Sequence, residues 1–230
     1  MQPAPLLLAI LLGWGFLAQT DGSDGKSAKA EAADESKPTA DEVVSEIQDF
    51  YEGTSDYRAD FKQVYKNKLY NETKKSSGKV YIKRPGKMRW EYKKPNEKLF
   101  VSDGKTLWVW EKEANQVYKQ DLQNSDLPIA IAFLMGQGNL AEDFDYELVE
   151  NAKAAKKGLI VLELVPKKPT THYKKLLFMV DDSSYMVKRT IIIDQTGNTN
   201  SMRFEKVKTN QGIKSSKFKF KMPKGASLVE

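Results

Sequence analysis

Cysteine does not occur in the 230-residue chain, and its absence excludes disulfides, thiolate metal sites, cysteine nucleophiles and a lipid anchor on an N-terminal cysteine. Histidine occurs once, as His172 in the segment Pro169–Tyr173, where a solvated turn residue is a better interpretation than a catalytic base. The sequence also has no Gly-rich phosphate loop, metal-ligand spacing or nucleophile motif. It therefore predicts no enzyme activity, no metal and no cofactor.

Charges of both signs are frequent, with 37 Lys and Arg against 31 Asp and Glu. The formal net charge of +6 comes mainly from lysines spread over alternating segments, which is typical of solvated strand faces. Because there is no basic helix or clustered patch, the sequence predicts no nucleic-acid partner. A weak attraction to acidic partners or to anionic lipid headgroups stays open.

Long apolar runs are absent as well. The longest, Leu6–Leu17, is too short for a bilayer, which needs about 20 residues, but it has the length of a signal-peptide core. Met1–Pro5 carries no Lys or Arg, so the match is incomplete. We expect a signal peptide at 1–22, whose cleavage on export leaves a periplasmic or secreted protein, a disordered linker at 23–38 without side chains to bury, and one folded domain at 39–230.

The folded part begins with a helix. Thr39 and Glu42 form a capping-box pattern, and apolar residues recur at helical spacing from Val43 until Gly53. A second helix is expected over Leu127–Met135, apolar nearly all round and ended by glycines. A helix without a polar face must be buried, or must face something apolar.

Between and after these helices the period of the pattern is two. Asp103-Gly104 is a strong hairpin signal; a type I′ turn would place Leu99 opposite Trp108 and Val101 opposite Thr106, and either face of this hairpin could point inward. The strands expected in the second half are Tyr146–Glu150, Gly158–Pro166, Tyr173–Val180, Tyr185–Asp194, Asn200–Thr209 and Ser216–Lys221. Short connections favour an antiparallel meander. The fold class is therefore mainly β (α+β): an unclosed antiparallel half-barrel of about 10–11 strands around helices.

The stretch Gly78–Tyr92 places one arginine in an apolar row. Residues at every second position share one face of a strand, and this row reads Val80, Ile82, Arg84, Met88, Trp90 and Tyr92. An inward arginine cannot lose its charge and needs acceptors. The residues alone leave two alternatives even: loop carbonyls at the strand end, or helix carbonyls near Tyr51–Gly53 or Met135–Gly138.

Several segments, in order and at matching spacing, resemble the LolA family of periplasmic carriers of outer-membrane lipoproteins. They are Phe61-Lys62-Gln63, Lys83-Arg84-Pro85, Arg89-Trp90, Val101-Ser102-Asp103-Gly104-Lys105-Thr106-Leu107-Trp108 and Phe218–Gly225. The resemblance covers about Asp41 to Val229. Met88 stands where that family often has phenylalanine, and it is an apolar replacement.

This resemblance implies a helical lid over an apolar cavity that takes acyl chains. It implies that Arg84, followed by Pro85, latches the lid by bonding to helix carbonyls in the closed state. The candidates for the acyl-chain cavity are Val80, Ile82, Met88, Trp90, Trp108, Leu127, Ile131, Phe133, Leu134, Met135, Phe178, Met202 and Phe204. For each of them singly, ordinary core packing is the simpler interpretation.

The implied function is that of a periplasmic chaperone that takes lipoproteins released from the inner membrane and passes them to the outer membrane. The implied partners are lipoproteins, an inner-membrane lipoprotein-releasing ABC transporter as donor and an outer-membrane lipoprotein acceptor, with the protein itself a monomer. The alternative is a periplasmic lipoprotein- or lipid-sensing domain of similar half-barrel fold. A LolB-type acceptor role does not fit, because that protein needs a lipidated cysteine.

Overall fold

The computed structural model describes residues 37–122, 133 and 138–229. In this part of the chain one twelve-stranded sheet runs in the order β12-β6-β5-β4-β3-β2-β1-β11-β10-β9-β8-β7. Its strands are β1 Asp56–Asn67, β2 Glu72–Lys83, β3 Lys87–Lys94, β4 Lys98–Asp103, β5 Thr106–Glu111, β6 Gln116–Asp121, β7 Phe144–Leu148, β8 Leu159–Pro166, β9 Lys175–Asp181, β10 Val187–Ile193, β11 Thr199–Thr209 and β12 Ser227–Val229. The helices are α1 Ala40–Glu52, α3 Leu140–Asp143, α4 Ala152–Ala155 and the 3-10 helix η1 Ser215–Phe218.

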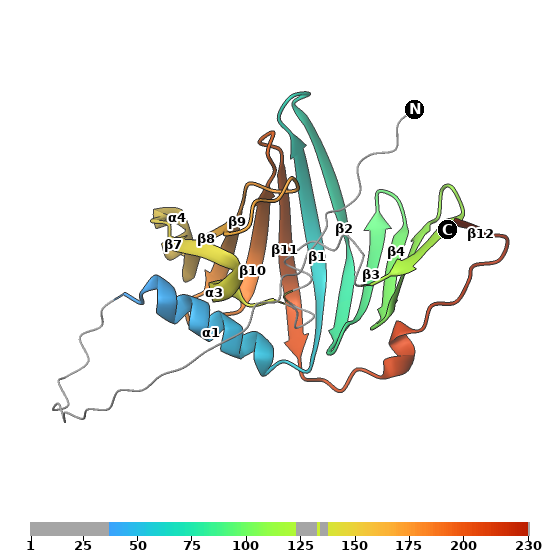
Figure 1. The fold of residues 1–230 in the computed structure, drawn as a ribbon, viewed down its shortest axis with the longest axis horizontal. Helices are drawn as coiled ribbons and strands as arrows, with labels where there is room; N and C mark the ends of the chain where they lie inside the picture. The colour runs from blue at the N-terminus through green and yellow to red at the C-terminus, as the bar shows by residue number, and fades with distance from the viewer. Residues whose placement is uncertain (1–36, 123–132, 134–137, 230) are drawn as a thin grey trace.

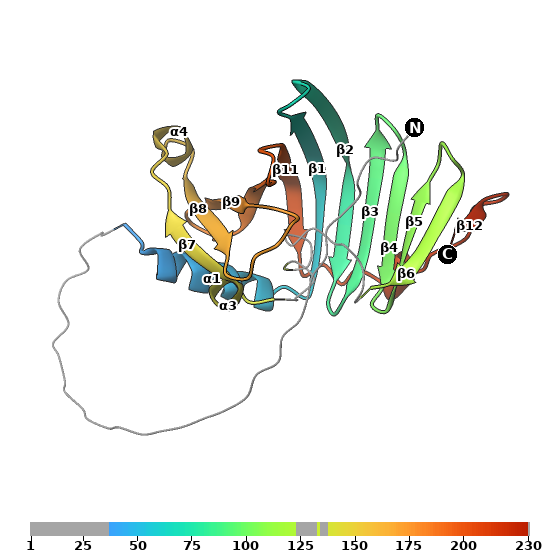
Figure 2. The same cartoon turned by 45° about the horizontal axis from the view of Figure 1, so that its top comes forward.

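The sheet is strongly bent and does not close. Figures 1 and 2 show its two edge strands, β12 and β7, far apart. Neighbouring strands pair antiparallel, as predicted, except that β12 pairs parallel with β6. The pairing of β11 with β1 joins the two halves of the chain into one sheet. The predicted unclosed half-barrel is confirmed, as a mixed sheet. No helix among residues 37–122 and 138–229 is long and apolar enough to cross a membrane.

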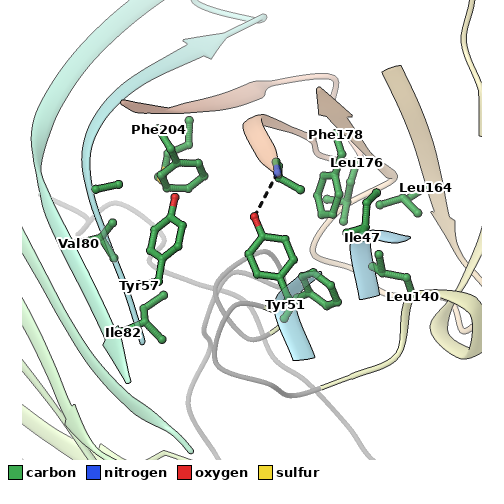
Figure 3. Close-up of a cluster of buried hydrophobic side chains, with 14 of the residues drawn as sticks. Ile47, Tyr51, Tyr57, Val80, Ile82, Leu140, Leu164, Leu176, Phe178 and Phe204 are labelled. Atoms are coloured by element: carbon green, nitrogen blue, oxygen red, sulfur yellow. Dashed lines mark hydrogen bonds between the residues drawn. The ribbon is translucent and has the colours of Figure 1, made fainter. Parts of the chain in front are cut away.

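The first helix forms where the capping pattern predicts it. The Thr39 side chain accepts from the backbone N–H of Glu42, whose carboxylate accepts from the backbone N–H of Thr39 at 2.8 Å. The apolar side of α1 carries Val43, Val44, Ile47 and Tyr51, all buried. Figure 3 shows Ile47 beside Leu164, Leu176 and Phe178, so this side of the helix faces strands β8 and β9. The helix thus lies against the inner face of the sheet's second half.

The outer face is covered by the C-terminal segment, and here one expectation is wrong. Ser216–Lys221 is not a strand: its first residues belong to η1, which contacts β3 and β4. Phe218 is buried, and the Phe220 ring stacks on Trp108 with centroids 5.8 Å apart. Phe218 and Phe220, whose alternation predicted a strand, therefore attach the C-terminal segment to the outer face of the sheet.

A buried carboxylate fixes the start of that segment. Asp56 is 1% exposed, and its two oxygens accept from the backbone N–H groups of Gln211, Gly212 and Ile213 at 2.8–3.1 Å. Three such bonds satisfy a charge that would otherwise be costly to bury. The end of β11 is thereby tied to the beginning of β1.

The predicted register of the β4–β5 hairpin is wrong by two residues. Leu99 lies opposite Trp110 and Val101 opposite Trp108. The carboxylate of Asp103 accepts from the N–H groups of Lys105 and Thr106, both at 2.9 Å, so the turn residues are Gly104-Lys105. A shift of two keeps the same residues on each face.

Candidate functional site

The inner face of the sheet is a continuous apolar surface. Val80, Ile82, Met88 and Trp90, which the alternation places on one face, are each at most 2% exposed. Phe178, Met202 and Phe204 come from strands on the other side of β1 and belong to the same buried cluster. The structure therefore brings together seven of the residues that the sequence assigns to a cavity.

Aromatic rings cover the middle of this surface. Phe61 lies 5.0 Å from Trp90 and 4.8 Å from Tyr92 between ring centroids. Its ring fits because Gly78 lies opposite it: a Cβ on Gly78 would stand 2.8 Å from the Phe61 ring and 1.8 Å from the carbonyl oxygen of Glu91. No local pattern in the sequence indicates that this glycine makes room for a ring.

Two polar atoms on this surface are buried without partners. Among the described residues, neither the Tyr57 hydroxyl nor the Trp90 indole nitrogen has a hydrogen-bond partner. Burial, and then the nearby Tyr51 hydroxyl, raise the pKa of Tyr57 well above its ordinary value. Both rings contact Phe204 edge to face, with centroids 6.1 and 6.3 Å away. Such groups destabilise the protein, so the inner face is not optimised for stability alone.

The helix α1 presents Tyr51 to the interior. Its hydroxyl accepts from the backbone N–H of Val187 in β10 at 3.2 Å, as Figure 3 shows. Burial raises the pKa of this hydroxyl, and the hydrogen bond from Val187 offsets only part of the increase. The Tyr51 ring meets Phe133 edge to face, with centroids 5.0 Å apart. Phe133 is 5% exposed and belongs to the same buried cluster. The remaining candidates of that segment, Leu127, Ile131, Leu134 and Met135, lie outside the described residues.

Arg84 connects the sheet to the end of α1. It follows β2, is partly buried, and its Nη1 donates to the backbone carbonyl of Tyr51 at 2.5 Å. Its backbone N–H donates to the carbonyl of Ser55 at 3.0 Å. The last turn of α1 has no basic residue of its own, so the guanidinium supplies the positive charge that a helix C-terminus favours. Arg84 thus bonds to a carbonyl in the first of the two predicted sets, Tyr51–Gly53, whereas residues 135–137 of the second set lie outside the described residues.

The turn that carries Arg84 is held by a hydrogen bond from Ser102 in β4. The Ser102 hydroxyl, completely buried, donates to the carbonyl of Gly86 at 2.9 Å and accepts from the N–H of Gly104 at 3.1 Å. Gly86 has φ +66°, and a Cβ there would stand 3.0 Å from the Cα of Gly104. Ser102 and Gly104 belong to a segment that carries the family resemblance, and these hydrogen bonds give both residues a structural role. Pro85, which follows Arg84, is exposed.

One cavity candidate lies on the wrong face. Trp108 shares its face with Val101 and stacks on Phe220 of the C-terminal segment, whereas Trp90 shares its face with Phe100 inside the sheet. The choice between the two hairpin faces could not be made from the sequence, because it depends on that distant segment. Trp108 is therefore an outer-face residue.

In the described parts of the chain, no group of three or more His, Asp or Glu side chains is placed to hold a metal ion. On the outer face, burial alone would raise the pKa of Glu91. The hydrogen bond from Arg89 and the charges of Lys217 and Arg89 outweigh it and lower that pKa below its ordinary value of 4.5. These charges tie η1 to β3, away from the inner surface.

Comparison with known proteins agrees with this geometry. Residues 52–221 match the family model described as outer membrane lipoprotein carrier protein LolA. An outer-membrane lipoprotein carrier protein of Chromobacterium violaceum is 33% identical over 204 residues, 88% of this chain and 95% of that protein. One of Dechloromonas aromatica is 28% identical over 187 residues, 81% of this chain and 87% of that protein. An uncharacterised conserved protein of Thermus thermophilus has the same fold, with TM-score 0.54, 14% identity, and 83% of this chain and 98% of that one covered.

Proposed function

The chain belongs to the LolA family of outer-membrane lipoprotein carrier proteins, and from this premise we propose how its own residues hold a lipoprotein and let it go. It is a periplasmic carrier of lipoproteins. The family consists of transport chaperones without catalytic activity, and we propose that this chain has none either.

The acyl chains are proposed to lie between the inner face of the sheet and α1. The support for this is the apolar surface around Val80, Ile82, Met88, Trp90 and Phe204, with soft methionine side chains that adapt to chains of varied shape. Each methylene that leaves water contributes roughly 0.8 kcal/mol. Several chains would then bind almost irreversibly to a site that stood permanently open.

A carrier must release what it binds, and Arg84 is proposed as the latch that makes release feasible. The observation that supports this is its hydrogen bond to the Tyr51 carbonyl, because that bond joins the strand end to the helix that covers the inner face. Opening α1 breaks a charge-assisted bond worth about 1.5–3 kcal/mol. This cost is subtracted from the affinity for cargo, so binding stays reversible.

The partners at the two membranes follow from the carrier role. We propose an inner-membrane lipoprotein-releasing ABC transporter as donor and an outer-membrane lipoprotein acceptor. We also propose that the protein acts as a monomer, that residues 1–22 are a signal peptide removed on export, and that residues 39–230 form one carrier domain behind a linker at 23–38. N-terminal sequencing of the exported protein would test the cleavage.

The decisive test of the function is the identity of the bound cargo. The protein is isolated from the periplasm under non-denaturing conditions, and co-purified molecules are identified by mass spectrometry. Acylated lipoproteins are expected, and the variant Phe178→Asp, changed on the inner face, should yield fewer of them. Recovery of apolar small molecules only, or of nothing, would contradict the carrier function and favour the lipid-sensing alternative.

A further inference from the structure

The hairpin that joins β1 to β2 ends in two exposed apolar side chains. Leu69 is 81% exposed and Tyr70 is 71% exposed, whereas the next most exposed large apolar side chain in the described residues, Met222, is at 48%. Scattered exposed apolar residues are ordinary, but two adjacent ones at the end of a hairpin form a small apolar tip. We call residues 67–75 the β1–β2 tip.

The tip stands clear of the sheet on the β3 side. Pairing between β2 and β3 begins only at Ser77 with Lys94, so residues 72–76 of β2 pair with β1 alone. Figures 1 and 2 both show this hairpin extending past its neighbours on the β3 side. A strand of twelve residues is roughly 40 Å long, so the tip lies far from the Arg84–Tyr51 bond at the other end of the hairpin.

The conformation of the tip is fixed rather than random. The Asn67 side chain accepts from the backbone N–H of Tyr70 at 2.9 Å, and the backbone N–H of Lys68 donates to the Asn198 side chain at 2.8 Å. Asn71 takes φ 49°, a conformation that asparagine tolerates better than most residues. Leu69 and Tyr70 are therefore held exposed by an ordered turn.

Positive charge surrounds these two side chains. Lys66, Lys68, Lys74 and Lys75 are all exposed, and the acidic residue between them is Glu72, whose carboxylate is 3.8 Å from the Lys74 amine. The segment 66–75 thus has a net charge of +3, from four lysines and one glutamate. An apolar, aromatic tip within a ring of lysines is complementary to a surface with anionic headgroups outside and hydrocarbon beneath.

We propose that the β1–β2 tip binds the surface of an anionic phospholipid bilayer, with Leu69 and Tyr70 entering the headgroup region and the lysines contacting lipid phosphates. Tyrosine suits this boundary because its ring is apolar and its hydroxyl stays hydrated. The lysines add attraction that acts over a distance of about one Debye length, roughly 8 Å at physiological salt. The contact is weak and reversible, and it does not depend on the carrier function.

The test measures binding of the exported protein, free of cargo, to vesicles. Vesicles of phosphatidylcholine with phosphatidylglycerol should bind it, and vesicles of phosphatidylcholine alone should bind it much less. The double variant Leu69→Ser/Tyr70→Ser should bind about tenfold more weakly or worse, since burying one leucine-sized side chain corresponds to at least about a tenfold step in affinity. Lys74→Gln/Lys75→Gln should bind about 25-fold more weakly, about fivefold for each lysine.

Matched controls separate the tip from general surface effects. Met222→Ser removes an exposed apolar side chain elsewhere, and Lys156→Gln/Lys157→Gln removes two exposed lysines next to α4; both should bind as the wild type does. The proposal is overturned if the wild-type protein does not bind anionic vesicles, or if the tip variants bind them as well as the wild type does. In the second case, loss of transfer in the tip variants would indicate a protein partner instead. Loss of vesicle binding with normal lipoprotein cargo would leave the carrier function intact.

Discussion

Replacing Arg84 by leucine tests the latch directly. The substitution removes the guanidinium that donates to the Tyr51 carbonyl and leaves the backbone bond from residue 84 to the Ser55 carbonyl in place. The turn itself should stay intact, because the Ser102 hydroxyl still holds it through the Gly86 carbonyl. We therefore expect a folded protein in which α1 separates more easily from the strand end.

The magnitude follows from one charge-assisted hydrogen bond. Losing about 1.5–3 kcal/mol from the closed state shifts the equilibrium toward the open state by roughly 10- to 150-fold. The apparent affinity for cargo rises by at most the same factor, because binding no longer has to break the bond. The Arg84→Leu variant should thus take up lipoprotein at least as well as the wild type and hand it on more slowly.

Two measurements check this. Transfer is followed in a reconstituted assay, from donor membrane to carrier and from loaded carrier to acceptor membrane. Hydrogen exchange of residues 49–54 in the cargo-free protein reports the opening of the α1 end and should be faster in the variant. Arg189→Leu is the matched control, because Arg189 is also partly buried and donates to the Ser201 hydroxyl at 2.7 Å, away from α1.

The outcomes distinguish whether the Arg84 bond holds α1 from whether opening of α1 limits release. Unchanged exchange at the end of α1 would mean that the bond does not hold the helix. Faster exchange with wild-type transfer rates would mean that helix opening does not limit release. Either result would refute the latch, and an equal effect of Arg189→Leu would show that loss of any partly buried arginine is sufficient.

Three further substitutions test the packing on both faces of the sheet. Gly78→Ala should lower the free energy of unfolding by about 3 kcal/mol in chemical denaturation, because a Cβ would stand 1.8 Å from the Glu91 carbonyl oxygen; unaltered stability would contradict the close approach. Tyr57→Phe removes a buried hydroxyl without a partner and should raise stability by about 1 kcal/mol in the same assay, whereas a loss would reveal a bond that the structure does not contain. Burial opposes the ionised form of Glu91, but Arg89 and Lys217 outweigh burial and lower the pKa of Glu91 in the folded state. The ionised carboxylate therefore stabilises the protein above pH 4.5, and this stabilisation is lost as the pH falls through the lowered pKa. Glu91→Gln should flatten this part of a profile of melting temperature against pH, and an unchanged slope would contradict the proposed role of the carboxylate.

The sequence was sufficient for features that rest on local pattern. Val80 and Ile82 on β2 and Met88 and Trp90 on β3 are buried on one face, as the alternation predicts, although a turn at residues 84–86 divides the predicted row between two strands. The start of α1 at Thr39 follows from its capping box in the same way. Arg84 was predicted to need acceptors, and its guanidinium donates to the Tyr51 carbonyl, one of the acceptors considered.

Features set by contacts distant in the sequence could not be predicted. The β4–β5 hairpin is apolar on both faces, so its inward face is decided by what covers the other one, and that is the segment around Phe218 and Phe220. The same segment alternates like a strand, but Phe218 is buried where η1 contacts β3 and β4, and Phe220 stacks on Trp108 of β5. The register error arose from placing Asp103 inside the turn, where its side chain instead caps the turn from outside.

The edge strands β12 and β7 lie far apart, so the sheet does not give its interior a fixed width. In a closed barrel, by contrast, strand number and stagger fix the diameter. If acyl chains lie on the inner face as proposed, a change of twist between neighbouring strands would let the same open sheet curve around different amounts of cargo.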